Sequence, residues 1–371
     1  MSEYEPKTLK KAYNKMEHGS ARIAAMRGAI QAADQQGDHP FRIFFRLDLC
    51  RESNFYDDSM DMMVVFPEVL AIIDKYPDTP STVFNSNFKD SMAHILWVYK
   101  WILSSCTSFY QIPMEDCLKF YEDFKRRSLA YGYNLRPYYK CKYGFYFHID
   151  RAAAEEAFHA FEELPRDANS DCKACERNTV INFYLRTDQP KRAAELSEEI
   201  ENFSLTCGGG RMRAWLNMKE NYMDYYLRKR EFEEAEKYCR LIDPNRIRND
   251  EFGAWDDFLY CYAYRNIGKA LKIYKNNWKD WEEERCPWSI FEISLNNIRF
   301  FQELGRVRKR KTVKLPLDRS FPLYQESGQY SIEEICQYYY NRAGKMADCF
   351  DRRNGSQACQ HMLREAVEYA K

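Results

Sequence analysis

The chain has little of what marks several broad classes of protein. Glycine and proline number only 14 and 13 among 371 residues, and no strand pattern runs for more than a few residues, which argues against a β-rich fold. Lysine plus arginine and aspartate plus glutamate number 56 each, so no net charge attracts the chain to nucleic acid or to an anionic membrane. The composition favours helices and argues against nucleic acid as a partner.

Long apolar runs and a secretory signal are also missing. The most apolar stretches, 62–73 and 94–103, contain Glu68 and Lys100, and neither reaches the ~18 uninterrupted apolar residues of a membrane span. The first seven residues have neither the basic start nor the apolar run of a signal peptide. We therefore expect a cytoplasmic protein without a membrane partner, whose 13 cysteines are mostly buried, reduced thiols.

No catalytic motif is present either. None of the six histidines belongs to an HExxH pair, and no G-x-S-x-G nucleophile elbow occurs. The glycine-rich stretch 207–210 lacks the Lys-Ser/Thr of a phosphate loop and follows an expected helix instead of a strand. We therefore expect a protein that is not an enzyme, and an enzyme with a scattered site is the lowest-ranked class.

What the chain has in abundance is aromatic residues, at 16% with 28 tyrosines, beside 30% charged residues. The stretch 211–244 shows how they are used. Its apolar residues recur mainly at spacings of three, four and seven, which places them on one face of a helix. A polar turn at 228–231 follows, then a second helix that Asp243-Pro244 ends, because the residue before a proline leaves the helical region. The apolar positions of the first helix are Met212, Trp215, Leu216, Tyr222, Met223, Tyr226 and Leu227.

This unit resembles a tetratricopeptide repeat. The residues at the repeat's large, large, aromatic and small positions are Tyr222, Tyr226, Phe232 and Ala235. Pro244 closes the unit, whereas Met223 stands where the family has a small residue, so the repeat is degenerate. The resemblance implies a solenoid in which neighbouring repeats of about 34 residues complete each other's core.

The same hairpin pattern recurs from residue 136 onward. We pair 136–149 with 151–164, 174–187 with 190–202, 211–229 with 231–242, and 250–265 with 267–283. The equivalent small positions are Ala157, Ala194, Ala235 and Ala270. The predicted fold is all-α, a right-handed superhelical solenoid of tetratricopeptide-like hairpins.

The chain before and after these hairpins is less regular. Ser20 and Gly37 are expected to begin and end a helix over 20–36, as N-cap and C-terminal stop. Further helices are expected at 41–55, 57–75 with a kink or restart at Pro67, 88–105, 113–131, 288–304, 331–352 and 356–369, with a loop at 77–87. The expected regions are a polar lead-in at 1–19, irregular helices at 20–135, tandem hairpins at 136–304, a basic connection at 305–328 and capping helices at 329–371.

The leading functional hypothesis is a non-enzymatic module that binds another protein or a short peptide in the concave groove of the repeat array. Aromatic anchors would supply affinity there and charged residues would supply specificity. The expected groove residues are Tyr139, Lys142, Tyr146, Thr179, Phe183, Arg186, Asn217, Glu220 and Asp224. The alternative is an intracellular peptide-responsive regulator, because the layout is loosely similar to that of the Rap-type regulators that carry such repeats.

Two further stretches have a functional and a structural interpretation. Cys172, Cys175 and Cys207 fall at the same end of one expected hairpin and could bind a structural zinc ion, with His148 or His159 as a fourth ligand. Otherwise they are small buried residues at a repeat junction, and no cofactor is expected. The basic run Arg306, Arg308, Lys309, Arg310, Lys311 and Lys314 could contact phosphates, but a solvated helix end is the more common role.

Overall fold

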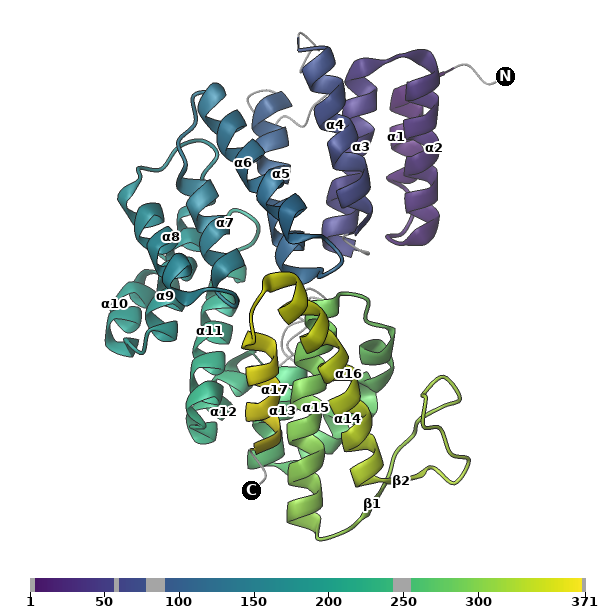
Figure 1. Ribbon diagram of the computed structural model, residues 1–371, viewed down its shortest axis with the longest axis vertical. Coiled ribbons are helices and arrows are strands. Elements are labelled where there is room, and N and C mark those ends of the chain that lie inside the picture. The colour runs from purple at the N-terminus through teal and green to yellow at the C-terminus, as the bar shows by residue number, and fades with distance from the viewer. Residues whose placement is uncertain (1–3, 57–59, 78–90, 243–254, 369–371) are drawn as a thin grey trace. The chain divides into compact units, whose positions relative to one another are not determined.

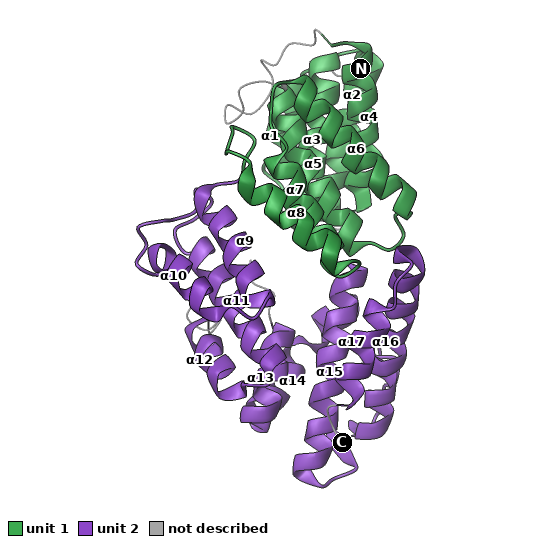
Figure 2. Ribbon diagram, turned by 60° about the vertical axis from the view of Figure 1, so that its left-hand side comes forward, with its two compact units in different colours: residues 1–170 green, residues 171–371 purple. Residues whose placement is uncertain are grey.

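The computed structural model describes residues 4–56, 60–77, 91–242 and 255–368. Over these residues the protein has seventeen helices and two short strands (Figure 1), which confirms the predicted all-α class. The chain divides into two compact units, residues 1–170 and residues 171–371 (Figure 2). Apart from Pro77, the expected loop at 77–87 lies outside the described residues, as does Pro244.

Unit 1 consists of eight helices over its described residues, most of them packed on their neighbours in sequence. They are α1 (Pro6–Tyr13), α2 (Ser20–Gln36), α3 (His39–Tyr56), α4 (Met60–Lys75), α5 (Ser91–Ser108), α6 (Met114–Ala130), α7 (Arg136–Tyr146) and α8 (Arg151–Glu163). Helix α5 also packs on α7 and α3. Helix α2 has the predicted bounds and ends at Gly37 in the left-handed conformation. Its N-cap, however, is Gly19 and not Ser20. Helix α4 continues through Pro67 as one element.

The lead-in at 1–19 is more ordered than its polar composition indicates. Helix α1 forms there because Tyr13 anchors it: its ring is 1% exposed and its hydroxyl donates a 2.7 Å hydrogen bond to Asp48 on α3. A buried tyrosine usually needs such a partner for its hydroxyl group. Tyr13 is the only aromatic residue within α1 itself, so the apolar periodicity of this polar segment was too weak to predict the helix.

A buried arginine ties three helices of unit 1 together. The Arg127 side chain on α6 is 5% exposed and donates a bidentate pair of hydrogen bonds, at 2.7 and 2.6 Å, to Asp74 at the end of α4. It also donates to Asp123, one turn earlier on α6, at 2.8 Å. Asp123 in turn accepts a hydrogen bond from Tyr99 on α5. A buried guanidinium is tolerated because its charge is paired and most of its donors are used.

Unit 2 consists of further helical hairpins and ends in three helices that pack on one another. Its helices are α9 (Lys173–Arg186), α10 (Pro190–Glu201), α11 (Arg213–Lys229), α12 (Phe232–Ile242), α13 (Trp255–Arg265), α14 (Ile267–Glu283) and, as the last three, α15 (Pro287–Arg308), α16 (Ile332–Asn354) and α17 (Ala358–Glu368). Strands β1 (Thr312–Lys314) and β2 (Gln329–Ser331) pair antiparallel within the connection between α15 and α16. Helices α9 and α11 pack together, as do α11 and α13, and α13 and α15.

Buried alanines mark where the two helices of each hairpin approach closely. Ala157, Ala235 and Ala270 are buried as expected. In α10 the buried residue is Ala193, at 0% exposure, whereas Ala194 is exposed. The predicted register of this hairpin is therefore wrong by one residue. Two consecutive alanines fit the pattern equally well, and a one-residue slip turns a helix face by about 100°.

The corrected register leads to a matched prediction. Ala193→Leu should lower the free energy of unfolding by ~1–3 kcal/mol, because the added methylenes have no room where the helices cross. Ala194→Leu, one position away on the exposed face, should change it by less than about 0.5 kcal/mol. Urea denaturation of the two variants measures the difference, and equal effects would show that the register is not the one described.

Candidate functional site

A cavity of about 550 Å³ lies within unit 2. It is lined by residues of α9, α11, α13, α14 and α15 and of the short segment before α15. The lining residues are Arg186, Glu220, Asn221, Asp224, Trp255, Asp256, Asp257, Asn277, Asp280, Trp281, Glu284, Ser289, Glu292 and Ile293. Four of the five helices are the first helices of successive hairpins, so their stacking brings these side chains to one place.

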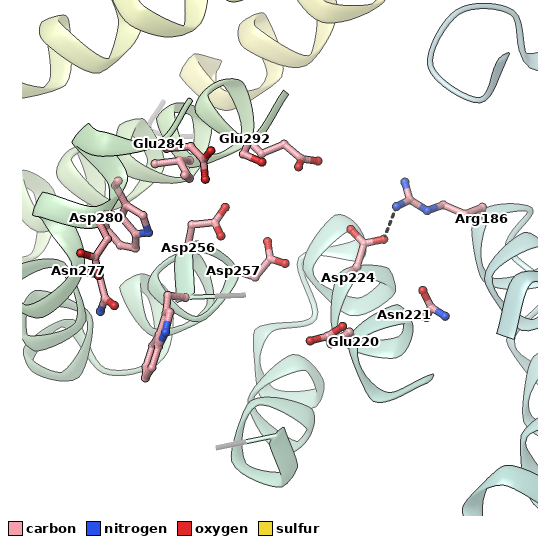
Figure 3. Close-up of a pocket in the computed structure, with 14 residues that line it drawn as sticks. Arg186, Glu220, Asn221, Asp224, Asp256, Asp257, Asn277, Asp280, Glu284 and Glu292 are labelled. Atoms are coloured by element: carbon pink, nitrogen blue, oxygen red, sulfur yellow. Dashed lines mark ion pairs between the residues drawn. The ribbon is translucent and has the colours of Figure 1, made fainter. Parts of the chain in front are cut away.

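The charge of this lining is strongly one-sided. Seven of its residues are carboxylic acids and one, Arg186, is basic. The Arg186 guanidinium pairs with Asp224 at 2.9 Å. Figure 3 shows the carboxyl groups of Asp224, Asp256 and Asp257 around a common space, with Arg186 as the single labelled cation. Carboxylates gathered in this way repel one another, and the packing of the surrounding helices, which limits the access of water, strengthens the repulsion.

The pKa values of the acids record this environment. Burial raises the pKa of Glu220 to about 7. Burial also raises the pKa of Glu292 to about 8, and the negative charges of Asp256 and Asp224 add to the increase. The Glu292 side chain is accessible from the cavity, yet the surrounding helices limit its hydration. Several acids of the lining are therefore partly protonated near neutral pH.

Asp256 and Asp257 are adjacent acids in the first turn of α13. Burial raises the pKa of Asp256 to about 6 and that of Asp257 well above its usual range, where repulsion from Asp256 contributes. The amide of Asn296 donates to Asp256 at 2.9 Å and to Asp257 at 3.2 Å. Arg299 donates to the Asn296 carbonyl at 2.7 Å. This chain of hydrogen bonds from α15 holds the two carboxyl groups in place.

Two tryptophans complete the walls of the cavity. Trp281 is buried on α14, with its ring centroid 6.1 Å from that of Tyr274. Trp255 begins α13 beside the acidic pair and is partly exposed. The face of an indole ring attracts a cation. Carboxylates and aromatic faces in one cavity make it suited to a ligand that carries positive charge.

The sequence-predicted groove residues do not all reach this cavity. Arg186, Glu220 and Asp224 line it. Thr179 and Asn217 are partly exposed on α9 and α11 but are not in its lining. Phe183 is 6% exposed and packs on Tyr184 in the core. The remaining three residues lie partly exposed on α7 in unit 1: Tyr139, Lys142 and Tyr146. There the Lys142 ammonium group is 5.7 Å from the centroid of the Tyr146 ring.

The acids on α13, α14 and α15 were missed from the sequence because acids at helical spacing usually form a solvated face. A local signal did exist. Trp255 precedes the two adjacent aspartates, and Trp281 follows Asp280 directly. A large aromatic beside acids, repeated in two neighbouring helices, is an unusual composition for a solvated surface.

The predicted cysteine cluster forms at the start of α9. Cys172 is the N-cap of α9, Cys175 lies in its first turn, and Cys207 lies in the connection from α10 to α11. Their three sulfur atoms all lie within 4.8 Å of one another. Burial alone would raise the pKa of the Cys172 thiol, but hydrogen bonds involving Cys175, Cys207 and Gly208 bring it below the usual value. Among the described residues, the cluster consists of these cysteines only, without His148 or His159.

The basic run lies at the end of α15 and beyond it. Arg306 and Arg308 belong to the last turn of the helix, and Lys309 ends it in the left-handed conformation. Arg306, Arg310 and Lys311 line a second cavity of about 600 Å³ in unit 2, which also contacts α16 and Val367 of α17. Whether any of these residues binds phosphate stays a prediction.

Comparison with known proteins identifies no relative of this chain. The chain matches no family model, no curated protein and no solved structure at a significant level. Across the parts of the chain that the structure describes, no helix combines the length and apolar character that crossing a membrane requires.

The raised pKa of Glu220 leads to a prediction about pH. The ordinary pKa of a glutamate is 4.5 and the pKa of Glu220 in the folded protein is about 7, so the unfolded chain ionises first and ionisation costs stability as pH rises between these values. Glu220→Gln should match the parent protein near pH 4.5, gain stability relative to it up to pH 7, and keep a constant advantage above. Thermal melts across pH measure this, with the exposed α12 variant Glu233→Gln as the control. A pH-independent difference would contradict the assignment.

Proposed function

We propose that this protein is a non-enzymatic binding module whose acidic cavity in unit 2 receives a basic segment of a partner protein or peptide. The single observation that carries the proposal is the lining of the cavity, with seven carboxylic acids and one arginine around about 550 Å³. A lysine or arginine side chain of the partner would enter this cavity. Its charge would offset the repulsion between the acids, while Trp255 and Trp281 would offer aromatic surface.

The size and the chemistry of the cavity support a ligand of this class. Its volume falls within the range of ligand-binding pockets in proteins, roughly 300–1,000 Å³. Arg186 is already paired with Asp224, so it leaves most of the acids for an incoming cation. A cationic ligand favours the ionised form of Glu220, Asp256 and Glu292, whose pKa values are about 7, 6 and 8. Binding should therefore release protons and strengthen as pH rises from 6 to 8.

The architecture that we propose for this function is the right-handed superhelix of tetratricopeptide-like hairpins expected from the sequence. In such an array the first helices of the hairpins line the concave face. Helices α9, α11, α13 and α15 are the first helices of their hairpins, and all four contribute to the cavity. This shared contribution supports a groove on that face, with the cavity as its most acidic part.

The place of action belongs to the same proposal. We propose a cytoplasmic protein, and support comes from the 13 cysteines, since none of them forms a disulfide, as the reducing cytosol favours. An intracellular regulator that responds to a short basic peptide is the alternative, and it would use the same acids. The two differ in the ligand: a regulator would bind the free peptide as tightly as the same peptide within a protein.

Fluorescence titration with synthetic peptides tests the proposal, because Trp255 and Trp281 line the cavity. A lysine- and arginine-rich peptide should bind, whereas a glutamate-substituted peptide of the same length should not. The double variant Asp256→Asn/Asp257→Asn should weaken binding by about tenfold or more, since losing an anchor contact typically costs upwards of ~1.4 kcal/mol. Affinity should also fall with added salt.

The matched control removes two acids from the exposed surface of α12 and α14. Glu233→Gln/Glu283→Gln replaces the same number of carboxylic acids by amides but leaves the cavity unchanged. It should bind the basic peptide within about twofold of the parent protein. If both double variants lose affinity equally, net charge explains the binding. If the basic and the acidic peptide bind alike, the cavity is not a site for cations.

A further inference from the structure

The cysteine cluster has the arrangement of a metal site and lies away from the acidic cavity's lining. Cys172 and Cys175 are separated by two residues across the start of α9, and Cys207 begins a tight turn that forms a bridge with Gly210. The sulfur atoms of Cys175 and Cys207 are 3.6 Å apart, and all three lie within 4.8 Å. Sulfur atoms bound tetrahedrally to one zinc ion at about 2.3 Å lie about 3.8 Å from each other.

Backbone amides point at two of the three sulfur atoms. The amide of Cys175 donates to the Cys172 sulfur at 3.4 Å, and the amide of Gly209 donates to the Cys207 sulfur at 3.3 Å. Hydrogen bonds of this kind favour the thiolate over the thiol, because they stabilise the charged form. The start of α9 adds the positive end of a helix dipole. Two separate turns thus direct backbone amides at the sulfur atoms that a metal would bind.

Gly209 gives the turn its close approach to the cluster. A Cβ atom at this position would lie 3.6 Å from the Cys207 sulfur and 3.1 Å from the Arg213 guanidinium. Glycine therefore lets the amide and the arginine lie next to the cysteine. Arg213 brings a positive charge to the side of the cluster where thiolates would accumulate negative charge.

We propose that Cys172, Cys175 and Cys207 bind one zinc ion. Binding converts three thiols and Zn²⁺ into a tris-thiolate complex and releases three protons to the solvent, so the bound group carries one negative charge. The fourth coordination position is taken by water or by a small exogenous ligand, which the partial exposure of all three cysteines permits. A soft thiolate set selects zinc over magnesium or calcium.

The bound ion would join the two ends of one hairpin. Cys172 and Cys175 begin α9, whereas Cys207 follows α10 and precedes α11. Zinc therefore would fix the connection between α10 and α11 to the start of α9. The same helix α9 ends at Arg186, so the metal would order the element that carries the single cation of the acidic cavity. Since different residues form the two sites, a failure of either proposal leaves the other intact.

Metal titration of the full chain tests the proposal. Protein reduced and freed of metal with a chelator is titrated with Zn²⁺, and with Co²⁺ for its thiolate-to-metal absorption band. We expect one equivalent bound, a cobalt spectrum with strong charge-transfer absorption, and a melting temperature that rises with free zinc. Cys207→Ser should bind zinc at least about 100-fold more weakly, above the range for second-shell changes.

A cysteine elsewhere in unit 2 provides the matched control. Cys349 on α16 has the same intermediate exposure, and Cys349→Ser should bind zinc as the parent protein does. If Cys207→Ser does not fold, alkylation of the parent protein tests the proposal instead. Bound zinc should protect the thiols of Cys172, Cys175 and Cys207 from the alkylating reagent. Zinc binding that is unchanged in Cys172→Ser and Cys207→Ser overturns the proposal. So does a Cys175–Cys207 disulfide that persists in reducing buffer and excludes the metal.

Discussion

The structure depends on a constraint that every hairpin shares: neither of its helices can bury its apolar face without the next hairpin. Small residues make the stacking possible, since Ala193, Ala235 and Ala270 are fully buried where paired helices approach. A larger side chain there would hold the helices apart. The position of each first helix in the stack, and therefore of its polar face, follows from these contacts in the core.

The acidic cavity is a consequence of that stacking. Glu220, Asp257 and Glu292 belong to three different helices, and their pKa values are raised, which would not occur on an isolated helix in water. Packing brings them together, and burial then makes their charges costly. The helices hold the acids in place because the core contacts outweigh this repulsion. Under the proposed function, the positive charge of a basic ligand would offset this repulsion.

The cysteine cluster depends less on the stack and more on local geometry. The N-cap position of Cys172 and the first-turn position of Cys175 follow from where α9 begins. The tight turn at Cys207 follows from the glycines after it. Only the return of the chain through α10 brings the third sulfur to the other two. Helix α9 thus has Cys172 and Cys175 at its start and Arg186 at its end. Its position in the hairpin therefore places both the cysteine cluster and the one arginine of the acidic cavity.

Except for α1, the sequence by itself determined the helices and the local motifs, because both depend on short-range spacing. The bounds of α2, the hairpin pairs and the convergence of Cys172, Cys175 and Cys207 could be predicted from periodicity, glycines and prolines. The structure alone decided between Ala193 and Ala194, because two adjacent alanines have the same local preference and only the neighbouring helix distinguishes them. It also decided which acids share a cavity: Asp256 and Glu292 meet across helices 36 residues apart in the chain, and no spacing rule within one helix reports such a contact.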